Sequence, residues 1–87
     1  MPAEYTVTFA RSARKELEAF DPALISRILR RIEALADDPR PAGCRKLRSA
    51  KNLWRLRVGD YRIVYAVSDR HRAVDVITVR HRREAYE

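Results

Sequence analysis

The chain has 87 residues, and its 19 Lys and Arg against 12 Asp and Glu give a formal charge of +7. This length fits one domain with one modest core and excludes a two-domain enzyme with a separate cofactor module. No apolar run approaches the roughly 18 residues of a membrane span, and residues 1–5 lack the features of a signal peptide, so we expect a cytoplasmic protein with no membrane partner.

The N-terminal half predicts a strand and a helical hairpin. Tyr5–Phe9 alternates large apolar with small polar side chains, which is typical of a strand. Ser12 is then expected to cap a first helix that runs to about Phe20. Asp21-Pro22 is a second helix start, and its apolar stripe of helical period ends at Asp37-Asp38-Pro39, because the residue before a proline avoids the helical region.

The C-terminal half predicts a loop and three strands. Residues 40–52 show no clean period and are expected to form a loop. The strands are expected at Leu53–Val58, Tyr61–Val67 and about Ala73–Arg80. The order β-α-α-β-β-β over a single domain of residues 1–87 predicts an α+β fold, in which the helical hairpin packs on one face of a small, mainly antiparallel twisted sheet.

The positive charge is concentrated in one half of the sequence. Residues 1–44 have no net charge, whereas residues 45–87 carry the whole +7. Sixteen of the 19 bases are arginine, whose planar fork binds phosphate oxygens two at a time. An arginine-rich composition would explain the ratio of Arg to Lys but not the asymmetry, which predicts a face that meets a polyanion.

Strand alternation brings the arginines to one face. If Trp54 and Leu56 face the helices, the residues that alternate with them point away from the helices. In the same way, if Ile63, Ile77 and Val79 point toward the helices, the residues next to them on the other two strands point away. The arginines expected to converge there are Arg55, Arg57, Arg62, Arg80 and Arg82, with Lys46 and Lys51 at the rim. These arginines could instead pair with acids such as Asp60, Asp69, Asp75 and Glu84. Five on one face with few acids favour a polyanion site.

Two residues near the C-terminus could add other chemistry. Tyr86 could stack on a base or pin the chain end by packing. His81 could move protons near neutral pH, although a lone histidine is usually structural. The sequence has no Gly-rich phosphate loop and no metal-ligand cluster, so no metal or cofactor is expected.

Three segments together resemble the RelE toxins of the RelE/ParE superfamily of type II toxin–antitoxin systems: residues 46–48, Leu53–Tyr65 and His81–Tyr86. The resemblance implies a hydrolase of the mRNA interferase kind, an endoribonuclease that enters the ribosomal A site, cuts mRNA and inhibits translation. It implies attack of the ribose 2′-hydroxyl on the adjacent phosphate without a metal. It also implies a cognate acidic antitoxin that neutralises the toxin in a hetero-oligomeric complex.

The resemblance also implies residue roles. Arg55 and Arg57 stand where well-studied members place the basic pair that activates the 2′-hydroxyl, and those members have lysines there. Because arginine is a poor general base, His81 or a loop lysine is an alternative base. Arg62 would hold the phosphate, Arg82 would assist the leaving oxygen and Tyr86 would orient the base. The residues expected to bind RNA phosphates are Lys46, Arg48, Lys51, Arg80 and Arg83.

Two other functions stay open at this point. A ParE-like toxin would share the fold but inhibit DNA gyrase by binding, and would cut nothing. A degenerate toxin would act only as a module that binds nucleic acid or antitoxin. The basic face together with Arg82 and Tyr86 favours the nuclease, because a gyrase binder does not need them.

Overall fold

The structure, a computed structural model, describes residues 4–48, 50–81 and 83. Strand β1 (Thr6–Phe9) precedes two helices, α1 (Arg11–Glu18) and α2 (Pro22–Glu33), and a short 3₁₀ turn, η1 (Ala34–Ala36). Four strands follow, β2 (Arg45–Lys46), β3 (Leu53–Val58), β4 (Tyr61–Ser68) and β5 (Ala73–His81). They form one sheet in the order β1-β5-β4-β3-β2, in which β1 runs parallel to β5 and the other pairs are antiparallel.

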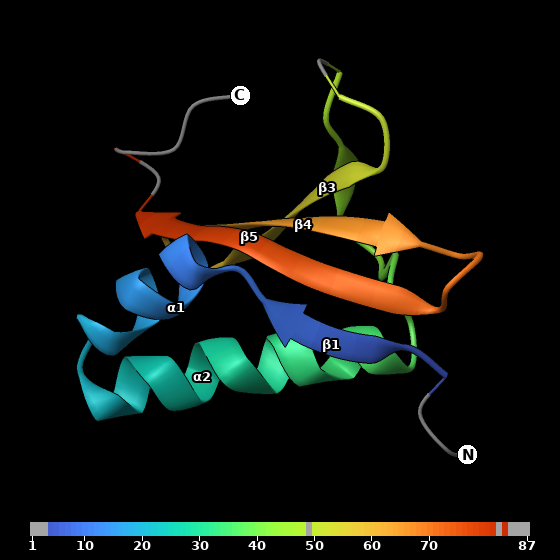
Figure 1. Cartoon of the computed structure of the whole chain (residues 1–87). Helices are drawn as coiled ribbons and strands as arrows, with labels where there is room; N and C mark the ends of the chain where they lie inside the picture. Colours follow the sequence, from blue (N-terminus) through green and yellow to red (C-terminus); the bar gives the residue numbers. More distant parts are fainter. Residues whose placement is uncertain (1–3, 49, 82, 84–87) are drawn as a thin grey trace.

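Both helices lie on one side of the sheet (Figure 1). The predicted α+β fold with a mainly antiparallel sheet is therefore confirmed. The sequence did not predict strand β2, which lies inside the segment 40–52 that was expected to be a loop. Neither helix of the described part of the chain is long and apolar enough to cross a membrane.

The second helix begins as the sequence predicts, and the first does not. The Asp21 side chain accepts a hydrogen bond from the backbone N–H of Leu24 at 3.0 Å, with proline in the first helical turn. The residue that caps α1 is Ala10, so the expectation that Ser12 caps this helix is wrong. Ser12 lies within α1, and its hydroxyl donates to the carbonyl oxygen of Ile77 on β5 at 2.9 Å.

The core lies between the helices and the sheet. Its fully or nearly fully buried members come from both layers: Ala13, Leu17, Ile28, Ile32, Leu35, Leu56, Val58, Ile63, Tyr65, Val67, Val74, Val76 and Val79. Tyr65 is the largest of them, and its hydroxyl donates to the carbonyl oxygen of Pro39 at 2.8 Å. This bond ties the segment after the helices to the centre of β4.

Tyr65→Phe should lower the free energy of unfolding by about 1–2 kcal/mol at neutral pH, because a buried carbonyl loses its donor. Burial, with a further contribution from Cys44, raises the pKa of the Tyr65 phenol above its ordinary value. Above about pH 10 the unfolded chain therefore loses this proton before the folded chain does, and wild-type stability falls. The difference in free energy of unfolding between wild type and Tyr65→Phe should therefore be smaller above about pH 10 than at neutral pH. Urea unfolding of both proteins at the two pH values measures this difference. A gap independent of pH would contradict this environment for Tyr65.

A bulge in β5 decides which way the end of that strand faces. Val64 pairs with Thr78 and Tyr65 pairs with Val76, so Ile77 is an extra residue in the ladder. Val79 is buried as expected, whereas Ile77 is only half-buried and lies outside the buried core, of which Val76 is a member. In a regular strand Arg80 would lie on the same face as buried Val76, toward the helices. The extra residue shifts the alternation by one position and turns Arg80 to the opposite face.

Candidate nucleic-acid interface

Three arginines form a row across the face of the sheet that is turned away from the helices. Arg57 on β3 lies opposite Arg62 on β4, and Arg62 lies opposite Arg80 on β5. Because neighbouring strands are about 4.8 Å apart, these three side chains leave the sheet from adjacent positions on one face. We call these residues the arginine row. Arg62 is half-buried, while Arg57 and Arg80 are exposed.

A second pair of arginines lies next to the arginine row. Arg45 on β2 pairs with Arg55 on β3, and Arg55 shares its face with Arg57, about 6.6 Å away along the strand. Burial lowers the pKa of the Arg55 guanidinium, and the positive charges of Arg62, Arg45 and Arg57 lower it further. The charges are therefore close enough to repel one another, and an anion placed among them would relieve that repulsion.

Arg45 is the residue of this face that sequence reasoning missed as part of the site. Its strand has only two residues, so it offers no alternation from which a face could be inferred. Its place becomes visible only through pairing with Arg55.

Two of the four acids that were considered as partners for the arginines bind other residues. Asp69 binds Arg40 at 2.8 Å and accepts a hydrogen bond from Tyr5 at 2.6 Å. Asp75 accepts a hydrogen bond from Thr8 at 2.9 Å. Glu84 lies outside the described residues. Arg80 is paired, but with a carboxylate that was not considered, that of Glu16 on α1.

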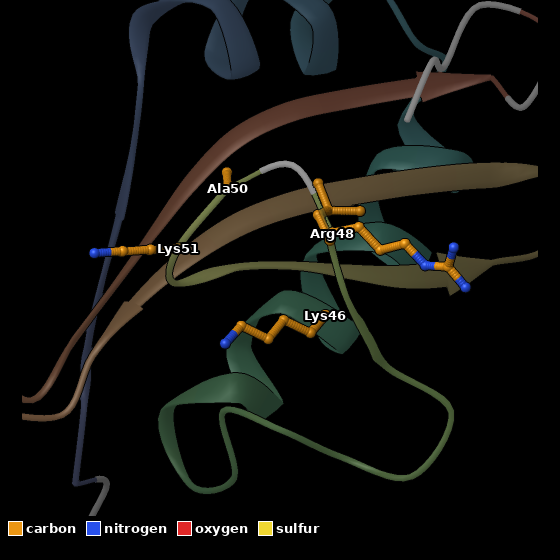
Figure 2. Close-up of a pocket in the computed structure, with 5 residues that line it drawn as sticks. Lys46, Arg48, Ala50 and Lys51 are labelled. Carbon is orange, nitrogen blue, oxygen red and sulfur yellow. The ribbon is translucent and has the colours of Figure 1, made fainter.

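Three residues predicted to bind RNA phosphates surround the tip of the hairpin that joins β2 and β3. They line an open concavity of about 480 Å³ together with two small or apolar neighbours: Lys46, Leu47, Arg48, Ala50 and Lys51. Figure 2 shows Lys46 and Lys51 extending to one side of this concavity and Arg48 to the other. The hairpin projects from the sheet on the side away from the helices (Figure 1). The tip adjoins the start of β3, whereas Arg57 lies near its end, so the basic surface extends along the strand.

The structure separates His81 from the arginine row. His81 lies opposite Tyr61 in the strand register, and their rings meet edge-on with centroids 5.3 Å apart. The rings of Tyr61 and Phe20 also meet edge-on, with centroids 4.9 Å apart, which places this aromatic group on the helix side of the sheet. The His81 Nδ1 accepts a hydrogen bond from the backbone N–H of Arg83, which is exposed. Two predicted site residues, Arg82 and Tyr86, lie outside the described residues.

Comparison with known proteins matches nearly the whole chain to one family. A family model described as the ParE toxin of the type II toxin–antitoxin system parDE matches residues 7–86. Toxin RelG of Mycobacterium tuberculosis is 29% identical over 83 residues, which cover 94% of this chain and 95% of the relative.

Solved structures share the fold over a similar range. The archaeal RelE–RelB complex from Pyrococcus horikoshii matches with a TM-score of 0.82 and 26% identity, covering 94% of this chain and 99% of that chain. The intact E. coli RelBE toxin–antitoxin complex matches with a TM-score of 0.78 and 26% identity, covering 95% and 99%. The order of strands and helices described above is therefore that of RelE structures.

Proposed function

The chain belongs to the ParE toxin family of type II toxin–antitoxin systems, and from this premise we propose that it is a ribosome-dependent endoribonuclease that cuts mRNA. The arginine row carries the proposal. Arg57, Arg62 and Arg80 adjoin one another on one face and can together hold a single phosphodiester. Charge-assisted bonds from guanidinium to phosphate are strong and directional, which suits a site that must fix one phosphate for reaction.

In the proposed reaction the ribose 2′-hydroxyl oxygen attacks the adjacent phosphorus and the bond to the 5′-oxygen breaks. The products are a 2′,3′-cyclic phosphate and a 5′-hydroxyl, so the proton lost by the 2′-hydroxyl is balanced by one gained at the leaving oxygen. Negative charge grows on the phosphate oxygens in the transition state, where Arg62 and its neighbours stabilise it. Arg55 and Arg57 flank the attacking hydroxyl, Arg82 assists the leaving oxygen and Tyr86 orients the base.

The cleavage rate should rise with pH with a slope of about one from about pH 6 to about pH 9, because guanidinium groups stay protonated and leave hydroxide as the base. His81 faces the helix side, away from the arginine row. Single-turnover cleavage of ribosome-bound mRNA at a series of pH values gives the profile. A plateau near neutral pH that disappears in His81→Ala would identify His81 as the base. A plateau that disappears when Lys46 or Lys51 is changed would identify a loop lysine.

The proposed partners are the ribosomal A site with its mRNA, and a cognate acidic antitoxin in a hetero-oligomeric complex. Several structural relatives are themselves complexes of a RelE toxin with RelB. A chain with a formal charge of +7 attracts an acidic segment that folds on contact. Coexpression of the two chains should yield a complex whose formation blocks cleavage.

Mapping of mRNA ends after addition of the protein to translating ribosomes tests the function. Cuts at fixed positions within codons support the nuclease. The family description names a ParE toxin, which favours a ParE-like inhibitor of DNA gyrase as the alternative. Intact mRNA together with loss of supercoiling by gyrase would support this alternative and contradict our proposal. Intact mRNA with unaffected gyrase would indicate a degenerate toxin that only binds.

A further inference from the structure

Helix α1 is fastened to the part of β5 that carries the bulge. Strand β1 ends at Phe9, opposite Val76, so β5 continues beyond it. There the Ser12 hydroxyl donates to the carbonyl oxygen of Ile77 at 2.9 Å, and the Glu16 Oε1 accepts from the N–H of Val79 at 2.9 Å. Ser12 and Glu16 are four residues apart and therefore lie on the same side of the helix. They bind the backbone of the extra residue and of the residue two positions further along β5.

The second oxygen of the same carboxylate binds an arginine of the row. Glu16 Oε2 accepts a hydrogen bond from Nε of Arg80 at 2.6 Å, and the side chain of Glu16 is 23% exposed against 44% for Arg80. The Glu16 carboxylate thus accepts a hydrogen bond from the backbone of Val79 with one oxygen and from the guanidinium of Arg80 with the other. Because the backbone bond fixes the carboxylate, the direction of the Arg80 side chain is fixed as well.

We propose that Glu16 is a positioning residue for RNA cleavage, which fixes the side chain of Arg80 at the end of the arginine row before RNA binds. The inference rests on the proposed function. The bulge at Ile77 turns Arg80 to the outer face. The Glu16 carboxylate then orders the long Arg80 side chain in advance, so that less conformational entropy is lost when the arginine binds phosphate. It also offsets part of the repulsion within the row, since its negative charge reaches Arg80 from α1.

Glu16→Gln separates this role from a purely structural one. The glutamine keeps an acceptor for the Val79 N–H and removes the charge that holds Arg80. We expect kcat for mRNA cleavage on ribosomes to fall about tenfold. KM should stay unchanged or fall, because one negative charge leaves a basic surface, and the melting temperature should not change. Glu18→Gln, on the same helix and exposed, is the matched control and should behave as wild type.

A double mutant tests whether Glu16 acts through Arg80. In the Arg80→Ala background, Glu16→Gln should have no further effect on kcat. A full additional loss in that background, or a loss that follows the melting temperature, would overturn the proposal and leave Glu16 as a clamp for the strand edge.

A measurement independent of cleavage distinguishes failure of this inference from failure of the proposed function. The Nε–H resonance of Arg80 in NMR spectra should be protected from solvent exchange in the wild type and lost in Glu16→Gln. If the wild type cuts no mRNA, the nuclease proposal fails, while a protected resonance would still support Glu16 as the residue that holds Arg80. Equal exchange in both proteins would overturn the positioning role itself.

Discussion

Arg62→Ala is expected to slow mRNA cleavage by about 10²–10³ while the protein stays folded, since removal of one donor aimed at transition-state charge has effects of this size. Arg62 is the central member of the arginine row, with Arg57 on one side and Arg80 on the other. Its loss therefore leaves a gap in the middle of the proposed phosphate site. The side chain projects from the face opposite the core, so truncation opens no cavity among the buried residues.

Growth arrest on induction and single-turnover cleavage measure the effect, and circular dichroism with thermal unfolding reports the fold. The matched control is Arg31→Ala, which removes the same charge from an exposed position on α2. This control should arrest growth like the wild type. If Arg62→Ala unfolds the protein, the strand faces are assigned wrongly. If it cuts mRNA at the wild-type rate, the arginine row is not the site.

Strand alternation was the part of the sequence that predicted the site best. Leu53–Val58 has the bounds that the sequence predicts, and Arg57 faces Arg62 as the period of two requires. The prediction succeeds here because both strands have one buried face, so a shift by one residue would expose the whole apolar set. The local pattern and the tertiary packing specify the same register.

The bulge shows where a local pattern fails. Arg80 was expected on the outer face because Ile77 and Val79 were placed inward, but the structure buries Val76 and Val79 and leaves Ile77 as the extra residue. The face of Arg80 was predicted correctly because Val79 points inward, although the bulge before Val79 was not predicted. The bulge is held by contacts from α1, more than 60 residues earlier, which no window along β5 contains.

Residue type alone also misleads when the side chain serves packing. Histidine suggests proton chemistry, yet His81 lies against Tyr61 on the helix side, because it continues the inward phase of Val79. The catalytic roles of Arg82 and Tyr86 come from resemblance to RelE toxins, although alternation had also placed Arg82 on the outer face. They remain predictions for mutagenesis.

Ile63→Ala should have the opposite effect to its neighbour Arg62→Ala. Ile63 is fully buried on β4, between Leu56 on β3 and Val79 on β5. Removing its side chain leaves a cavity on the helix side of the sheet, and such changes lower the free energy of unfolding by about 2–5 kcal/mol. For a domain of this size the melting temperature should fall by on the order of 10 °C or more.

Urea unfolding measures the change, with Val64→Ala as the control on the opposite face of the same strand. Val64 is half-buried, so its truncation should be clearly less destabilising than that of Ile63. Equal effects at the two positions would mean that β4 does not separate a core face from an RNA face. Under conditions where Ile63→Ala remains folded, it should cut mRNA at close to the wild-type rate, because every arginine of the row is still present. Loss of activity without loss of stability at Arg62, beside loss of stability without loss of activity at Ile63, follows only if adjacent residues of β4 point to opposite faces.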